Sequence, residues 1–252
     1  MNFISIKKPT QSISICLLYT GAWLFMMACG SVPKDIAVNG ESFNADLVVS
    51  DNFSDGMDQW HVEQMSNGQV NVIDEKLEIN DASGCTIWLK EKLSGSIVIE
   101  YDVELIKNGG EFDRVSDLNC FWMAIDPTSP NDLFVNSDNR GGKFSNYDNL
   151  RLYYMGVGGN DNKTTRFRRY TGTGDRPLLP GHDLSASEYM LSPNTPYHIR
   201  IVAHNGVIQY FRNGIQFLDF VDESPYIAGH FGFRTVRNHM TIDNFKVYQL
   251  KN

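Results

Sequence analysis

The chain has 252 residues, with 22 Lys and Arg against 30 Asp and Glu, and a formal net charge of −8 at pH 7. An acidic chain lacks the basic surface by which proteins bind nucleic acid, so that function class is excluded. The same charge repels acidic polymers overall, so an acidic ligand would need a local basic patch.

An export signal is predicted at the N-terminus. Lys7 and Lys8 precede an uncharged apolar run at 13–28, which is the order of a secretory signal peptide. The run ends in MMAC and resembles the bacterial lipobox, where cleavage precedes a lipid-modified cysteine. We therefore expect residues 1–28 to be a signal peptide and Cys29 to be lipidated. An uncleaved anchor is the alternative, but the run is shorter than the roughly 20 apolar residues of a spanning helix.

Lipidation at Cys29 would hold the protein in the bacterial cell envelope, because acyl chains insert stably into a bilayer. The location would be periplasmic or at the outer-membrane surface, and Gly30 favours the outer membrane. Residues 29–50 are predicted to be a flexible tether, since 31–49 contains Pro, Asn and Ser without clear periodicity. The folded domain is then expected over 51–252.

From residue 51 onward, short apolar or alternating runs follow one another and no long amphipathic helix is predicted. The runs lie at 69–79 (a hairpin), 86–89, 96–106, 118–125, 150–155, 164–170, 197–204, 207–212, 215–221, 230–236 and 239–250. Asn205-Gly206 and Asn213-Gly214 are typical of two-residue hairpin turns. This pattern predicts an all-β sandwich of two antiparallel sheets.

Two long polar segments, 126–147 and 172–196, interrupt the strands and are expected to rim one face of the sandwich. For Cys85 and Cys120 two interpretations are open: a disulfide, which export permits, or two buried thiols. Neither a Cys/His cluster nor ordered calcium-ligand spacing occurs, so no metal site or cofactor is predicted. A structural calcium ion has no motif to support it.

The C-terminal segments YHIRIVAHNGVIQYFRNGIQFLDFVD and GHFGFRTVRNHMTIDNFKVYQL resemble the closing strands of the concanavalin A-like lectin/glucanase superfamily. DNFSDGMDQWHVE resembles its first strand. More narrowly, NLRLYYMGVGGNDNKTTRFRRY resembles the YesU-like family of bacterial proteins. The resemblance covers about residues 51–250. It implies a jelly-roll sandwich with a concave sugar-binding face, acting in the degradation of polysaccharides, often of the pectin type, and implies no particular reaction.

Alternation along 164–170 places Arg166, Arg168 and Tyr170 on the face opposite Phe167. Two guanidiniums beside a phenol suit the carboxylate of a uronic acid, because Arg binds carboxylates bidentately. The alternative is a solvated face on which each Arg pairs with an Asp. The predicted substrate-binding residues are Arg166, Arg168, Tyr154, Trp122, Asn160 and Arg234. A core role for Trp122 is an equal alternative, and Arg234 is included because it lies in the closing segment of the resemblance.

The acids of EYDVE, Glu100, Asp102 and Glu104, share one strand face and match the E-x-D-x-E signature of the superfamily's retaining glucanases. Retention requires two carboxyls about 5–5.5 Å apart, whereas Cα atoms at i and i+4 of a strand lie roughly 13 Å apart. Asp102 and Glu104 are therefore expected on an acidic solvent face. Glu100 is predicted to line the concave face as a catalytic carboxylate.

His239 is the second predicted catalytic residue. A His or a Tyr near an Arg could run β-elimination, in which Arg neutralises the uronate and the base removes its C5 proton.

Three functions follow. The first is a lyase or glycoside hydrolase for acidic pectin-type glycans. The second is a glycan-binding lipoprotein without catalysis, which uses the same face. The third is a structural lipoprotein. The predicted partners are a saccharide and, through Cys29, a membrane.

Overall fold

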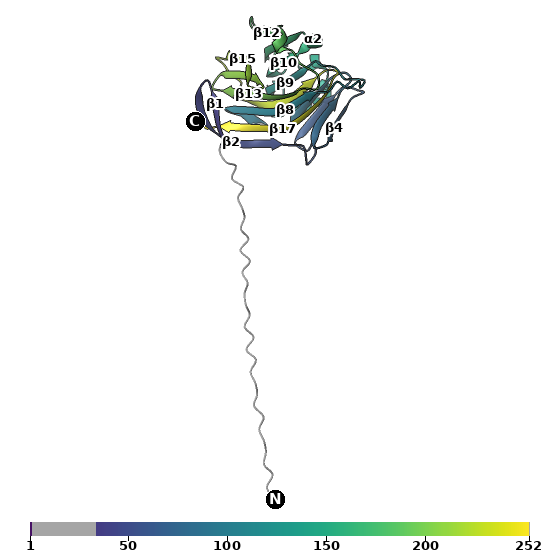
Figure 1. The fold of residues 1–252 in the computed structure, drawn as a ribbon. Helices are drawn as coiled ribbons and strands as arrows, with labels where there is room; N and C mark the ends of the chain where they lie inside the picture. Colours follow the sequence, from purple (N-terminus) through teal and green to yellow (C-terminus); the bar gives the residue numbers. More distant parts are fainter. Residues whose placement is uncertain (2–33, 252) are drawn as a thin grey trace. The chain divides into compact units, whose positions relative to one another are not determined.

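The computed structural model describes Met1 and residues 34–251, so the predicted signal peptide and Cys29 lie outside the described residues. Two antiparallel sheets form the fold (Figure 1). Sheet A contains β1 (Lys34–Val38), β2 (Glu41–Asp51), β4 (Gln69–Ile73), β5 (Lys76–Asn80), β8 (Ile97–Leu105), β13 (Pro196–His204), β14 (Val207–Arg212), β15 (Ile215–Val221) and β17 (His239–Leu250).

Sheet B contains β3 (Trp60–Gln64), β6 (Cys85–Leu89), β7 (Leu93–Ser94), β9 (Leu118–Ile125), β10 (Arg151–Gly158), β11 (Thr164–Thr171), β12 (Asp183–Leu184) and β16 (Ala228–Thr235). Its hydrogen-bonded order is β12-β11-β10-β9-β16-β6-β3, and that of sheet A is β1-β2-β17-β8-β13-β14-β15. Short helices connect the strands: η1 (Leu133–Asn136), α1 (Ser137–Arg140), η2 (Phe144–Tyr147), α2 (Gly159–Asn162) and η3 (Ser187–Tyr189). The predicted sandwich of two antiparallel sheets is confirmed.

The main core lies between the sheets and is rich in aromatic rings. Tyr101 of β8, on sheet A, packs edge-on against Phe233 of β16, on sheet B, with ring centroids 5.0 Å apart. Trp122 is fully buried in the same core beside Tyr153. The expected stacking of Trp122 on a sugar is therefore wrong, because β9 turns this ring toward the interior. Cys85 and Cys120 are buried free thiols in this core, which excludes the disulfide.

The first hairpin overturns the predicted tether for residues 34–50. These residues form β1 and β2, joined at Asn39-Gly40, whose φ angles are 49° and 83°. Two consecutive positive φ values are typical of a type I′ turn. Ile36 and Val38 of β1 are buried against Val98 and Tyr248 on the outer face of sheet A. This second apolar layer orders a segment whose polar composition had suggested a tether.

The two Asn-Gly turns of the C-terminal third are confirmed. Asn205 and Gly206 have φ angles of 46° and 85°, and Asn213 and Gly214 have 50° and 77°. They place β13, β14 and β15 side by side at one edge of sheet A. No helix of the described residues is long and apolar enough to cross a membrane.

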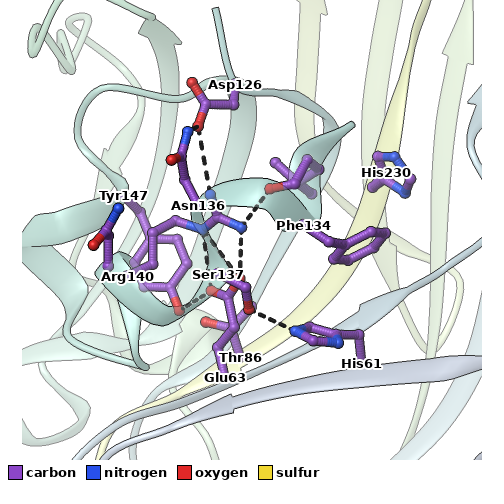
Figure 2. Close-up of polar contacts among 12 residues, drawn as sticks. His61, Glu63, Thr86, Asp126, Phe134, Asn136, Ser137, Arg140, Tyr147 and His230 are labelled. Atoms are coloured by element: carbon purple, nitrogen blue, oxygen red, sulfur yellow. Dashed lines mark hydrogen bonds and ion pairs between the residues drawn. The ribbon is translucent and has the colours of Figure 1, made fainter. Parts of the chain in front are cut away.

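A buried ion pair anchors the segment between β9 and β10 over the outer face of sheet B (Figure 2). Arg140 of α1 donates from Nη2 and Nε to Oε1 of Glu63 on β3, at 2.6 and 3.1 Å, and the two side chains are 3% and 1% exposed. The Tyr147 hydroxyl donates to Glu63 Oε2 at 2.6 Å. Burial and the Glu63 charge raise the Tyr147 pKa, so this hydroxyl keeps its proton as a donor.

A second clamp holds the segment between β8 and β9. His239 lies between two carboxylates, with Nδ1 2.8 Å from Asp113 Oδ1 and Nε2 3.2 Å from Glu78 Oε1. Asp113 also accepts hydrogen bonds from the backbone N–H groups of Asn108 and Gly110. This arrangement opposes the catalytic role predicted for His239, because Nδ1 is engaged in holding a loop and Nε2 faces Glu78 without forming a hydrogen bond among the described residues.

We expect Glu63→Ala to lower the free energy of unfolding by about 3–5 kcal/mol, because it leaves the Arg140 charge buried without its partner. Denaturant titration measures this loss. Glu91→Ala is the matched control, since Glu91 is exposed and its loss should change stability by less than about 0.5 kcal/mol. Equal stability of Glu63→Ala and the wild type would contradict the anchoring role.

Asp113→Asn should lower the melting temperature at pH 7, and the difference from wild type should shrink near pH 3. Burial by itself would raise the Asp113 pKa, but hydrogen bonds from Asn108, Gly110 and His239 outweigh it and lower the pKa. A lowered folded-state pKa adds stability above the unfolded value of about 3.9, and this stability is lost as the pH falls through the folded value. Thermal denaturation at both pH values measures it, and a constant difference would refute the clamp's ionic character.

Candidate functional site

A cleft of about 500 Å³ lies over β10 and β11 of sheet B, and we call it the arginine cleft. Its lining includes Arg114, Asp117, Phe144, Tyr154, Asn160, Asp161, Arg166, Arg168 and Arg176. Tyr154 pairs with Arg168 across the two strands, and Gly156 pairs with Arg166. Because neighbours across an antiparallel pair share a face, these side chains gather at one place.

The predicted alternation along β11 is confirmed. Phe167 is buried in the core beside Trp122, whereas Arg166 and Arg168 line the cleft and Tyr170 packs in the apolar cluster on the same outer face. The segments 126–147 and 172–196 also rim this face as expected, since they supply Phe144 and Arg176 to the cleft.

Three of the four cleft arginines have carboxylate partners. Arg166 forms a bidentate pair with Asp183, at 2.8 and 3.0 Å. Arg114 binds Asp117 at 2.7 Å and Asp161 at 2.6 Å, and Arg176 lies 3.3 Å from Asp148. For Arg166, the alternative of a solvated face on which each Arg pairs with an Asp is therefore the correct one.

Arg168 differs from the other three. Its Nη1 donates to the backbone carbonyl of Arg176 at 2.6 Å, and none of the ion pairs among residues 34–251 includes it. Among the four guanidiniums of the cleft, that of Arg168 is consequently the one without a carboxylate within ion-pair distance. A carboxylate ligand would bind there with a charge-assisted hydrogen bond.

The Asn160 side of the cleft is a left-handed turn. Asn160, Asp161 and Asn162 have φ angles of 53°, 57° and 60°, a conformation that Asn and Asp tolerate better than other non-glycine residues. Asn162 holds the turn by exchanging two hydrogen bonds of 2.8 Å with the backbone of Leu191. A strained backbone of this kind persists only where surrounding contacts hold it in place. Here the turn keeps Asn160 and Asp161 in the cleft lining.

Tyr154 and Phe144 supply aromatic surface, with ring centroids 5.7 Å apart. Burial raises the Tyr154 pKa, as do Tyr170 and Asp117, against the opposing charges of Arg234 and Arg168. The phenol is therefore neutral at physiological pH. Gly156 makes room for it, because a Cβ at this position would lie 2.1 Å from the Tyr154 hydroxyl oxygen.

Two further predicted residues lie elsewhere. Glu100, predicted as a catalytic carboxylate on the concave face, points to the outer face of sheet A, where it is 2.7 Å from Nζ of Lys34 on β1 and does not line the arginine cleft on sheet B. The alternation of β8 decides this, since Ile99 and Tyr101 occupy the core-facing positions.

Arg234 is 1% exposed and lies under the rings of Phe144 and Tyr147, with centroid distances of 5.2 and 5.3 Å. Its Nη1 donates to the carbonyl of Gly142 at 2.6 Å. Arg234 supports the segment above it. The substrate-binding role predicted for Arg234 is wrong, because its side chain does not line the cleft.

Sequence reasoning missed Arg114, Asp117, Phe144 and Arg176, which all come from connecting segments. Their positions depend on anchors far away in the chain, such as His239 for the segment that carries Arg114. No spacing within the sequence signals this arrangement. Within residues 34–251, no three His, Cys, Asp or Glu side chains are grouped to hold a metal ion.

Comparison with solved structures identifies the fold. A Bacillus subtilis protein of unknown function with a galectin-like fold is 17% identical, with a TM-score of 0.64, over 87% of this chain and 99% of that one. The endo-β-1,3-glucanase of Pyrococcus furiosus is 11% identical, with a TM-score of 0.57, over 88% and 100%. The carbohydrate-binding module CBM66 of B. subtilis is 13% identical, with a TM-score of 0.52, over 77% and 97%.

These likenesses confirm the jelly-roll fold of the concanavalin and galectin type that the sequence resemblance implied. No curated protein sequence matches this chain significantly. A family profile does match, over residues 79–245, which include strands β8 to β16 and every cleft residue named above. The chain belongs to the family described as Domain of unknown function (DUF6250).

Proposed function

We propose that this protein binds an acidic saccharide, one that contains uronic acid, in the arginine cleft. The observation that carries the proposal is Arg168, a guanidinium without a carboxylate partner that lies beside the neutral phenol of Tyr154. A uronate would supply the missing carboxylate to Arg168. The Tyr154 and Phe144 rings would contact the apolar face of the sugar.

The charge distribution supports this cleft over other hollows. Hollows of about 450 and 420 Å³ lie against sheet A and are lined by Asp51, Asp55 and Asp58 or by Asp102, Glu104 and Asp243. Such acidic linings repel a uronate. The arginine cleft is thus the local basic patch that an acidic ligand needs on a protein of net charge −8.

Similarity of fold adds support of a general kind. A carbohydrate-binding module and a glucanase share this sandwich. We further propose that the ligand is a pectin-type glycan. We also propose that the protein is exported as a lipoprotein and is anchored through Cys29 in the cell envelope, at the outer membrane. Membership of the narrower YesU-like family also stays a prediction.

Arg168→Ala should weaken the binding of oligogalacturonates about tenfold to hundredfold, since a hydrogen bond to a charged group contributes roughly 1.5–3 kcal/mol. Isothermal titration calorimetry with the full-length protein measures this. The apolar run at 13–28 calls for a detergent, which should lack a sugar head group so that it does not compete.

Lys246→Ala is the matched control, because it removes one positive charge from sheet A and should leave the affinity unchanged. A neutral galactan of equal length should bind more weakly than the acidic oligomer. Unchanged affinity for oligogalacturonates in Arg168→Ala would overturn the proposal.

β-Elimination in the same cleft is the second candidate. The step would move the C5 proton to a base, form the C4–C5 double bond and expel the C4 oxygen, which takes up a proton. Tyr154 is the proton donor that this candidate would use, because it lines the cleft and its phenol is protonated at neutral pH. The cleft carboxylates Asp117 and Asp161 are both bound to Arg114, so binding is the better supported function.

Incubation with polygalacturonate should therefore give no unsaturated uronate and no new reducing ends. Ultraviolet absorbance measures the first product, and a reducing-sugar assay measures the second. An absorbing product that disappears in Tyr154→Phe, while that variant still binds oligogalacturonates, would establish the lyase instead. Reducing ends without absorbance would establish a hydrolase.

A further inference from the structure

A second hollow, of about 260 Å³, lies beside α1 and η2, and we call it the asparagine groove. Its polar lining includes Asp126, Asn136, Asn139, Arg140, Asn146 and Asn149. Phe144 and Asn146 both belong to η2, but Phe144 lines the arginine cleft and Asn146 lines this groove. The groove is therefore a separate site on the same face of sheet B.

One atom in the groove lacks a hydrogen bond. Arg140 is 3% exposed, and its Nε and Nη2 are occupied by Glu63 and by the carbonyl of Leu133. Its Nη1 has no hydrogen-bond partner among the described residues, and Oδ2 of Asp126 lies 3.6 Å away, beyond hydrogen-bond distance. A buried donor left without a partner is costly, so a ligand or solvent oxygen is expected there.

The amides around this atom present free hydrogen-bonding groups. Nδ2 of Asn136 donates to Asp126 Oδ2 at 2.8 Å, and Nδ2 of Asn146 donates to the carbonyl of Asn139 at 2.9 Å. The side-chain oxygens of both are left as acceptors. The exposed side chains of Asn139 and Asn149 make no hydrogen bond within the described chain.

The charge of the groove distinguishes it from the arginine cleft. Arg140 is already paired with Glu63, so Asp126 gives the lining a negative charge, and the remaining polar side chains are neutral. An anion such as a uronate would thus be repelled from this groove. Hydroxyl groups both donate and accept hydrogen bonds, and adjacent hydroxyls on a ring can therefore bind the amides, the carboxylate and the guanidinium N–H of this lining.

We infer that the asparagine groove is a second saccharide-binding site, which takes a neutral sugar residue through its hydroxyl groups. Arg140 Nη1 would donate to one hydroxyl, and Asn139 and Asn149 would bind its neighbours. This site does not depend on the acidic-sugar proposal for the arginine cleft. If both hold, the natural ligand is a glycan that contains neutral and acidic residues.

Saturation-transfer NMR tests the groove with the methyl glycosides of glucose, galactose and mannose as probes. We expect at least one of them to receive saturation from the full-length protein. The double variant Asn139→Ala with Asn149→Ala should lower that affinity at least about tenfold, because two or more hydrogen bonds are lost. Both side chains are exposed, so the melting temperature should not change.

Two controls locate the binding of the glycoside in this groove. Asn131→Ala removes an exposed amide of the same segment outside the groove and should bind the glycoside as the wild type does. Arg168→Ala should also bind it normally, and the double variant should keep its affinity for oligogalacturonates. No saturation of any glycoside, or equal saturation in the double variant, would overturn the inference and leave solvent as the partner of Arg140.

Discussion

The buried pair of Glu63 and Arg140 is the interaction on which the functional face of this protein depends. It joins β3, near the start of the fold, to α1 in the segment between β9 and β10. Tyr147 adds a third member to the network. With this segment fixed, Phe144 borders the arginine cleft and Asn146 borders the asparagine groove. A buried charge is tolerated only when it is paired and hydrogen-bonded. Because Glu63 and Arg140 must therefore stay together, the segment that covers the outer face of sheet B keeps its position, and with it the geometry of both hollows.

The two hollows differ in electrostatics although they share a wall. In the arginine cleft four guanidiniums meet, and carboxylates lie within ion-pair distance of all of them except Arg168. In the asparagine groove Arg140 is paired with Glu63, Asp126 carries a negative charge and amides provide the rest. The first is suited to an anion and the second to hydroxyl groups. A strained left-handed turn at Asn160 and a close approach of Tyr154 to Gly156 complete the cleft. Both features restrict how its side chains can move.

The predictions from the sequence differ from the structure at the places where segments that are distant in the chain meet. The pairing of β10 with β11 and the outward faces of Arg166 and Arg168 could be predicted, because strand alternation is a local property. Glu100 and His239 were predicted in the same site as these arginines, yet they lie on sheet A against Lys34 and between Asp113 and Glu78. Residues 34–50 were predicted as part of a tether because the segment lacks clear periodicity, although Asn39-Gly40 carried a turn signal of the kind recognised near the C-terminus. Their order comes from contact with Val98 and Tyr248.

Local sequence patterns were enough to predict most of the strands after residue 51, the two C-terminal Asn-Gly hairpins, the sandwich class and the face on which each residue of β11 lies. These follow from side-chain period and from backbone preferences within a few residues. Which charges meet could be known only from the three-dimensional arrangement. Asp183 pairs with Arg166 while Arg168 makes no ion pair among the described residues, and Arg234 is buried under Phe144. Arg140, which lines the groove of amides, keeps one N–H without a hydrogen-bond partner in the described part of the chain. Ion pairing depends on distances between atoms far apart in the chain, and these are set by sheet order and by the anchoring of the long segments, which local patterns do not encode.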